Sequence, residues 1–413
     1  MPSPAHPLAA LAGRGRRPRV VLSWGLGVDS TAVLLRWLLA PSSRDFPLED
    51  LVVVTAMTGD EWARTGRDAA EHVLPALRRH GVRLVQLARG RRNVSIDGDG
   101  VVVLDDSTSP EVLHLAGVYT LSDELAEAGT IPQSGGARLC SVHAKGDVLD
   151  PAIARLTGGH PYRHAVGFET GEASRAAKDT GYNTAARTGW YPLIDWGWHR
   201  TACLDFLREA TGITWSKSAC VFCPYAVMTR AGRAEVLPRW QDEEPTAGLT
   251  ALTLEHTALA LNPEQGLIAG RRAVDYVRLT GHHRLLAELD AHLAATAHAL
   301  YEVRRVLRPR RDDPAKLANG SRSLRRLATG ERGDLQVRLA DLARSYDVDL
   351  EHGEDGIVRV WLRRRGPRLP TGEHFLTVAP ATATDKQPVR FEQWWAALPA
   401  EQLVQPRQLR LAL

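Results

Sequence analysis

A glycine-rich turn near the start of the chain has the residue types of a phosphate-binding loop. It follows a short β-branched apolar run, precedes a helical apolar pattern, and contains Gly25, Gly27, Asp29, Ser30 and Thr31. Glycines let backbone N–H groups approach an anion closely, and the start of a helix adds its positive end. Hydroxyl groups can donate further hydrogen bonds to phosphate oxygens. The pattern predicts a phosphate site, with a tight turn that binds nothing as the alternative.

Two familiar nucleotide-binding loops do not match this turn. A P-loop requires G-x-x-x-x-G-K-[ST], and both the spacing and the lysine are missing here. A dinucleotide fingerprint requires a third glycine, which the turn also lacks. The sequence therefore favours neither of these two classes.

The four cysteines are a second group with chemical potential. Their small number, in a chain of 413 residues, suits a metal or redox site in a reducing cytoplasm better than a disulfide framework. Cys220 and Cys223 form a C-x-x-C motif with a proline directly after Cys223, and the two thiolates can bind one metal ion or cluster together. The C-x-x-C spacing alone leaves a redox disulfide, zinc and iron–sulfur open. Cys203 lies on a helix expected over residues 199–210, where simple burial is the alternative to ligation.

Bulk composition is that of an ordinary globular protein. The net charge is +4, and almost all basic residues are arginine, with lysine only at positions 145, 178, 217, 316 and 386. This bias makes arginine clusters weaker evidence for nucleic-acid binding and makes each lysine more informative. No apolar run is long enough to span a bilayer, so no membrane association is expected. Residues 1–18 have the composition of a disordered leader, with a transit peptide as the alternative.

Alternating strands and helices position the glycine turn within an α/β domain. After the first strand and helix, strands are expected over residues 51–55 and 82–87, with one helix over 63–80 between them. A hairpin over 93–108 and helices over 121–128 and 142–156 follow, before a strand over 164–167. This order is typical of a doubly wound, mainly parallel sheet.

The second half of the chain differs from the first in its residue composition and apolar pattern. Residues 226–300 are expected to be mostly helical, and residues 301–413 to form an arginine-rich α+β part. Within that part the pattern predicts a helix over 335–346, a strand over 357–362 and a final helix around the WWAAL motif. The α/β part that contains the glycine turn is accordingly expected to cover residues 19–225.

Five ordered motifs resemble those of the PP-loop ATP pyrophosphatase superfamily (adenine nucleotide alpha hydrolase-like), and in particular its phosphoadenosine phosphosulfate (PAPS) reductase-like family. The turn GLGVDST resembles the S-G-G-x-D-S loop, and TGDEW at residues 58–62 resembles D-T-G-x-E. RLCSVHAKGDVLDP resembles C-[CST]-x-x-x-K, and GFETGEASRA resembles G-x-x-x-x-E-x-x-R. WYPLIDW and SACVFCPY resemble P-L-x-x-W and C-x-x-C-P. The order of the motifs across about 200 residues carries this resemblance.

The resemblance implies an ATP site, with Mg²⁺, at the carboxyl edge of a doubly wound sheet. It assigns nucleotide binding to Ser23, Gly25, Gly27, Asp29, Ser30, Thr31, Thr58, Gly59, Glu61 and Glu172. It assigns stabilisation of the opening phosphoanhydride to Lys145 and Arg175, with Asp60 ordering nucleotide, magnesium or substrate. For Glu172 and Arg175, an ordinary ion pair along a helix is the alternative.

The resemblance also implies a [4Fe–4S] cluster, with Zn²⁺ as the alternative metal. Cys140 matches the position that joins the C-x-x-C pair, and Cys203 is the candidate fourth ligand beside Cys220 and Cys223. Iron and acid-labile sulfide in protein purified without oxygen would indicate the cluster, and stoichiometric zinc in colourless protein would refute it.

Two departures from the family pattern bear on function. Leu26 stands where the loop usually has glycine, and Gly25 where it usually has serine; a leucine there is strained if that position needs positive φ. No cysteine follows Cys223, whereas thioredoxin-dependent reductases of this family use one in a C-terminal tail. Adenylation of a substrate followed by sulfur transfer is therefore the leading expectation, with a sulfonucleotide (PAPS or APS) reductase and a non-catalytic nucleotide sensor as alternatives.

The expected partners follow from relatives in nucleic-acid modification. The arginines of residues 304–326 predict a contact with DNA or tRNA, with a solvated surface as the alternative interpretation. A sulfur-donor protein is a further expected partner.

Overall fold

The computed structural model describes residues 7–133, 138–268, 271–314, 316–318 and 320–399. The described residues divide into two compact units. Unit 1 contains residues 7–124 and 138–223, and unit 2 contains residues 125–133 and those described from 224 onward. None of the described helices is both long enough and apolar enough to cross a membrane.

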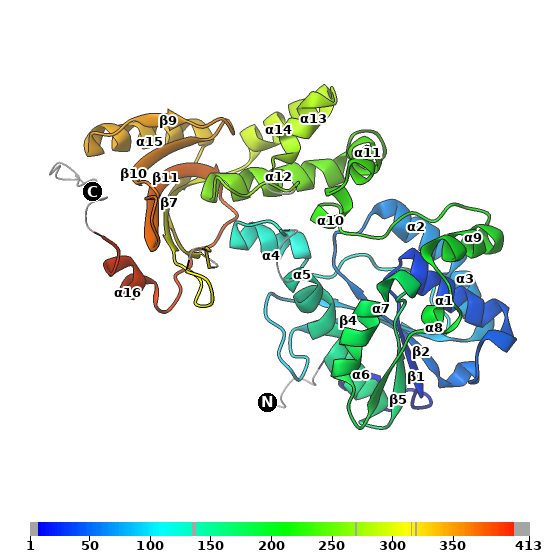
Figure 1. Ribbon diagram of the computed structural model, residues 1–413. Helices are drawn as coiled ribbons and strands as arrows, with labels where there is room; N and C mark the ends of the chain where they lie inside the picture. The colour runs from blue at the N-terminus through cyan, green and yellow to red at the C-terminus, as the bar shows by residue number, and fades with distance from the viewer. Residues whose placement is uncertain (1–6, 134–137, 269–270, 315, 319, 400–413) are drawn as a thin grey trace, which may run out of the picture. The chain divides into compact units, whose positions relative to one another are not determined.

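Unit 1 is an α/β domain built on a six-stranded sheet with the order β4-β3-β2-β1-β5-β6 (Figure 1). Its strands are β1 (Val20–Ser23), β2 (Leu51–Met57), β3 (Arg83–Arg89), β4 (Val101–Ser107), β5 (Tyr162–Ala165) and β6 (Arg187–Trp190). All neighbouring pairs are parallel except β3 and β4, which are antiparallel. The expected α/β class and mainly parallel sheet are confirmed.

Helices cover both faces of this sheet because both faces of its central strands are apolar. The helices of the unit are α1 (Val28–Leu39), α2 (Ala63–His72), α3 (Leu74–His80), α4 (Leu121–Ala128, shared with unit 2), α5 (Leu139–Ser141), α6 (Asp147–Thr157), α7 (Ala173–Asp179), α8 (Pro192–Asp195) and α9 (Arg200–Thr211). α1, α3 and α9 pack on the face that carries Val20 and Leu22. α6 packs on the opposite face, which carries Val21 and Val52.

Two local expectations for unit 1 are corrected. The single helix expected over residues 63–80 is broken at Val73, because Pro75 lies in the first turn of α3 and cannot continue the α2 hydrogen-bond pattern. The leader expected over residues 1–18 is structured where it is described. Leu8 and Leu11 are fully buried in the core beside α6, so apolar burial holds this segment against the sheet. Residues 1–6 lie outside the described part.

Unit 2 has its own antiparallel sheet, in the order β8-β7-β11-β10-β9. The strands are β7 (His298–Leu307), β8 (Ser321–Gly330), β9 (Leu350–His352), β10 (Val358–Arg363) and β11 (Thr371–Pro380). The helices are α10 (Pro224–Val227), α11 (Arg230–Pro238), α12 (Pro245–Leu261), α13 (Ala273–Leu279), α14 (His283–Ala295), α15 (Arg332–Tyr346) and α16 (Phe391–Ala396). The end of α12 packs on one face of the sheet and α15 on the other.

Candidate functional site

A pocket of about 350 Å³ opens at the carboxyl ends of β1 and β5 in unit 1. The chain leaves β1 toward β2 and reaches β5 on the other side, so these two strands form the point where the winding of the sheet reverses. Open α/β sheets bind ligands at this position, since the two loops diverge there. Gly167, after β5, makes the crevice close-fitting: a Cβ atom at this residue would lie 2.7 Å from the backbone nitrogen of Ser30.

The turn between β1 and α1 forms one wall of the pocket. Gly25, Gly27, Asp29 and Ser30 line it, and the Ser30 hydroxyl oxygen accepts a hydrogen bond from the Gly25 backbone nitrogen at 3.2 Å. Thr31 lies elsewhere: it is fully buried, and its hydroxyl accepts a hydrogen bond of 3.0 Å from Trp24 Nε1. The structure therefore places Thr31 where it fixes the loop from inside.

Leu26, at the top of this turn, has φ of +60°. A left-handed conformation costs a leucine free energy that a glycine does not lose, so the conditional expectation of strain at this position is confirmed. Two contacts hold the residue in place. Its side chain is only 2% exposed and packs in the core beside α1, and its carbonyl accepts a hydrogen bond of 3.0 Å from Trp215 Nε1.

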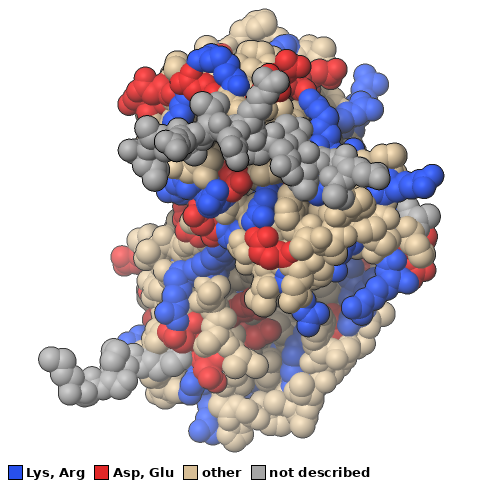
Figure 2. All heavy atoms as spheres, turned by 90° about the vertical axis from the view of Figure 1, so that its left-hand side faces the viewer, with Lys and Arg blue, Asp and Glu red and all other residues tan. Residues whose placement is uncertain are grey.

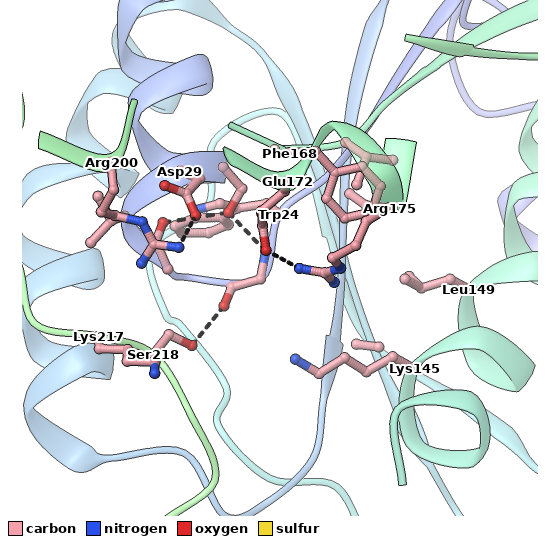
Figure 3. Close-up of a pocket in the computed structure, with 18 residues that line it drawn as sticks. Trp24, Asp29, Lys145, Leu149, Phe168, Glu172, Arg175, Arg200, Lys217 and Ser218 are labelled. Atoms are coloured by element: carbon pink, nitrogen blue, oxygen red, sulfur yellow. Dashed lines mark hydrogen bonds and ion pairs between the residues drawn. The ribbon is translucent and has the colours of Figure 1, made fainter. Parts of the chain in front are cut away.

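Four basic side chains from different segments line the pocket: Lys145, Arg175, Arg200 and Lys217. In Figure 3, Lys145 and Arg175 enter from one side of the view, and Arg200 lies on the other beside Asp29. Lys145 comes from a π-helical turn before α6, a rare helical form that is frequent at functional sites. Arg175 pairs with Glu172, which also lines the pocket, and its guanidinium lies 4.5 Å from the Phe168 ring centroid.

Sequence reasoning did not identify Arg200 and Lys217 as site residues. Arg200 begins α9 and pairs with Asp29 at 2.7 Å, and Lys217 precedes Ser218, whose hydroxyl oxygen lies 2.9 Å from the Gly25 carbonyl oxygen. One signal was available for Lys217, because lysine is rare in this chain. No local signal marks Arg200, since it reaches the pocket only through the packing of α9 on α1.

Asp29 is a carboxylate held in an unfavourable environment. Burial raises its pKa to about 6, against an opposing effect of the Arg200 charge, and Glu172 and Glu169 raise it further. Its Oδ1 atom is buried without a hydrogen-bond partner among the described residues. Ionisable groups whose pKa is shifted in this way by burial and by neighbouring charges are typical of functional sites.

This displaced pKa predicts a pH dependence of stability. The folded state holds the Asp29 proton up to about pH 6, while the unfolded chain releases it near the usual 3.8. The stabilisation of the folded state by protonated Asp29 is therefore complete below the pKa of this residue in the unfolded chain. It is lost as the pH rises through its pKa in the folded protein. We expect the free energy of unfolding of wild type, relative to Asp29→Asn, to fall by about 2 kcal/mol between about pH 4.5 and 7.5. Urea unfolding of both proteins measures this, and parallel pH profiles would contradict it.

The segment Thr58–Glu61 packs against the cysteine segment and is absent from the described lining of the pocket. Glu61 forms an isolated antiparallel bridge with Cys220, and its carboxylate accepts hydrogen bonds from Ser218 Oγ at 2.6 Å and Ala219 N at 3.0 Å. Glu61 therefore ties the cysteine segment to the end of β2.

Asp60 and Gly59 shape the turn beside this segment. Asp60 is buried and accepts a hydrogen bond of 2.8 Å from the Ser122 backbone nitrogen at the start of α4, and burial raises the pKa of the Asp60 carboxyl. Gly59 has φ of +87°, and a Cβ atom there would lie 2.4 Å from Thr120. The roles of Asp60, Gly59, Thr58 and Glu61 toward a nucleotide stay predictions.

Three of the four cysteines lie in the same region of unit 1. Cys140 lies near Cys223: burial is the main cause of the raised pKa of the Cys140 thiol, and the charge of Cys223 raises it further. Cys220 Sγ lies 3.7 Å from Thr58 Oγ1, and desolvation raises the pKa of its thiol to about 12.

Cys203 is placed differently, fully buried in the apolar core between α1 and α9. The charges that act on its thiol are those of Asp29, Arg200 and Glu169. In the part of the chain that the structure describes, no three His, Cys, Asp or Glu side chains are arranged to hold a metal ion. The four thiols as they lie do not fit a single cluster, so we derive no step through a metal.

The arginine-rich segment, residues 304–326, runs from the end of β7 to the start of β8, and most of its described arginine side chains are engaged within the fold. Arg304 pairs with Glu392, Arg305 with Glu373, and Arg325 with Glu302. Arg322 donates a hydrogen bond of 2.6 Å to the backbone carbonyl of Ala128, and Arg326 donates one to the backbone carbonyl of Ala383. Figure 2 shows Lys and Arg side chains interspersed with Asp and Glu on the visible face. This arrangement gives the predicted nucleic-acid contact no support.

Compared with known proteins, the chain matches no family model, no curated protein and no solved structure. The resemblance drawn from the ordered motifs therefore stays a prediction.

Proposed function

We propose that unit 1 binds ATP, as its magnesium complex, in the pocket at the ends of β1 and β5 and uses it to adenylate a second substrate. The observation that carries the proposal is the gathering of four basic side chains around a glycine turn at the start of α1. Backbone N–H groups, a helix N-terminus and several cations together favour a polyanionic ligand. This function agrees with the PP-loop ATP pyrophosphatase resemblance of the motifs.

The charges of the pocket favour a polyphosphate over a singly charged ligand. Its two carboxylates, Asp29 and Glu172, are each paired with an arginine, Arg200 and Arg175. Lys145 makes no ion pair with a described residue, and a ligand with several phosphates can satisfy it together with Lys217. Mg²⁺ enters with the nucleotide, since it binds mainly through phosphate oxygens and water in such sites.

The proposed chemistry breaks the bond between the α- and β-phosphates. An oxygen of the second substrate attacks the α-phosphorus, a new P–O bond forms, and pyrophosphate leaves with the electron pair of the broken bond. Lys145 and Arg175 stabilise the charge that develops on the departing phosphate oxygens. In the form that the motif resemblance implies, a sulfur nucleophile then displaces AMP from the activated carbon, so that a C–S bond replaces the C–O bond.

Gly25 offers a sharp test, because a Cβ atom added there meets no atom within 4 Å and its φ is not in the left-handed range. Gly25→Asp is expected to fold normally and to weaken ATP binding at least tenfold, since its carboxylate faces the phosphates. Gly25→Ala is the matched control and should bind within about threefold of wild type. Isothermal titration calorimetry with Mg–ATP measures both.

Turnover is measured on the same proteins with ATP labelled at the α- or γ-phosphate. Parallel reactions contain DNA, tRNA or a small-molecule extract as the second substrate. AMP and pyrophosphate are the expected products, and they should be lost in Gly25→Asp. Formation of ADP, or equal ATP binding by wild type and Gly25→Asp, would refute the proposal.

A nucleotide sensor is the second candidate, and Leu26 is the observation that favours it. The leucine is fixed with positive φ by core packing and by the Trp215 hydrogen bond, so the turn is rigid where the family pattern has an unstrained glycine. Tight ATP binding by wild type without AMP formation in any of the parallel reactions would support sensing over adenylation.

A further inference from the structure

A chain of hydrogen bonds runs from the pocket into the sheet of unit 1 and begins at Ser23. The Ser23 hydroxyl oxygen lies 2.8 Å from Nε2 of His164, and Nδ1 of His164 accepts a hydrogen bond of 3.0 Å from Nε of Arg187. Arg187 donates in turn to Asp179 at 2.7 Å, and the Tyr191 hydroxyl donates to the same carboxylate oxygen at 2.8 Å. The proposed adenylation chemistry uses none of the last four residues.

Strand register explains why His164 lies beneath Ser23. In the parallel pairing of β1 with β5, His164 is opposite Val21, two residues before Ser23. Alternate residues of a strand point to the same face, so Val21, Ser23 and His164 share one face of the sheet. Ser23 ends β1 and lines the pocket, which places its hydroxyl between His164 and the ligand space.

Arg187 fixes the tautomer of His164. An arginine side chain has only donors, so the Nδ1 atom that receives its hydrogen bond must carry a lone pair. A neutral imidazole then holds its proton on Nε2 and donates it to the Ser23 oxygen. The Ser23 hydroxyl proton is left for a different acceptor, and the pocket lies on its open side.

The surroundings of His164 keep the ring neutral. The residue is only 8% exposed, and burial and the Arg187 charge lower its pKa to about 4, while Asp179 acts in the opposite direction. The Tyr162 ring lies 6.2 Å from the imidazole. Burial raises the pKa of the Tyr162 hydroxyl, which the charges of Arg187 and Asp150 shift in opposite directions, and burial also raises the pKa of Asp150, against the Arg187 charge. The imidazole therefore acts as a fixed dipole between the sheet and the pocket.

We propose that His164 and Arg187 are positioning residues that commit the Ser23 hydroxyl to donate into the pocket, which selects a ligand atom that only accepts, such as a phosphate oxygen. The inference rests on the proposed function for the identity of that ligand. Its geometric part, the tautomer of His164, stands independently of any ligand.

The tautomer is measured by ¹H–¹⁵N correlation spectra of full-length protein labelled with ¹⁵N-histidine. In wild type, His164 is expected to be protonated at Nε2 and unprotonated at Nδ1. Arg187→Met removes the donor and should allow the other tautomer, whereas Arg187→Lys keeps a donor-only group and should preserve the wild-type spectrum. A wild-type ring protonated at Nδ1 overturns the proposal.

Binding of Mg–ATP and of inorganic pyrophosphate gives the second readout. Ser23→Ala should weaken both about tenfold, because one hydrogen bond to a charged oxygen is lost. Arg187→Met should also weaken both, but Ser23→Ala with Arg187→Met should bind no more weakly than Ser23→Ala alone. Independent losses that add in the double variant would overturn the proposal, since a purely structural role of Arg187 does not depend on Ser23.

The two proposals fail in distinguishable ways. If wild type binds neither ATP nor pyrophosphate, the proposed function fails, and the tautomer spectra still decide the inference about His164. If Arg187→Met does not fold, wild type, Ser23→Ala and Arg187→Lys retain both readouts: loss of the Nε2 tautomer in Arg187→Lys, or unchanged binding in Ser23→Ala, then overturns the inference.

Discussion

Replacing Lys145 by methionine is expected to lower the rate of AMP formation by about 10²- to 10³-fold while changing the dissociation constant of Mg–ATP by less than about tenfold. Methionine keeps most of the apolar stem and removes the charge. Lys145 lines the pocket without an ion pair to any described residue, so its charge is available to the phosphates. A preorganised cation contributes most where charge develops in the transition state, which explains why the rate should suffer more than binding.

Lys178→Met is the matched control, because Lys178 lies exposed on α7 of the same unit and is not part of the pocket lining. It should retain wild-type turnover in single-turnover assays with α-labelled ATP. Arg175→Met should lower the rate of AMP formation less than Lys145→Met does, because the Arg175 charge is already paired with Glu172. A rate within about threefold of wild type for Lys145→Met would exclude the catalytic role assigned to this lysine.

Local sequence patterns were sufficient for the first wall of the site. The change of period after Leu22, with glycines between, correctly predicts β1, the turn and α1. Comparison of this turn with the family's loop pattern identified Leu26 as a residue that would be strained at positive φ, and its φ of +60° confirms that conditional expectation. These features depend on residues that are neighbours in the chain, where backbone sterics and helix geometry decide the outcome.

Long-range packing decided what the sequence did not reveal. Arg200 and Lys217 lie far beyond the turn in the sequence, and His164 becomes a neighbour of Ser23 only through the register of β5 on β1. Ion pairs also explain why the arginine cluster was misleading in the sequence. Arg304, Arg305 and Arg325 have carboxylate partners from other strands and from α16. No local spacing encodes such partners, so a cluster of arginines in the sequence could not be distinguished from a basic surface.

Leu26 is expected to show an unusual order of stabilities in which glycine is better tolerated than alanine. Leu26→Ala should lower the free energy of unfolding by about 3–4 kcal/mol, because it removes a side chain that is 2% exposed in the core. Alanine also keeps the cost of positive φ. Leu26→Gly loses the same packing but relieves that cost, so it should be about 1 kcal/mol more stable than Leu26→Ala. Urea unfolding at neutral pH measures both.

The reverse order is normal for a buried residue with negative φ, and Val33 in α1 supplies that control. Val33 is fully buried in the same core, and there glycine should be less stable than alanine by about 1 kcal/mol. If Leu26→Gly is less stable than Leu26→Ala, the turn does not hold residue 26 in the left-handed region. If the order is as expected, Leu26→Gly also tests function, because it supplies the glycine of the family pattern. A higher rate of AMP formation in this variant would show that the leucine restrains catalysis, which is the property that the sensor alternative requires of it.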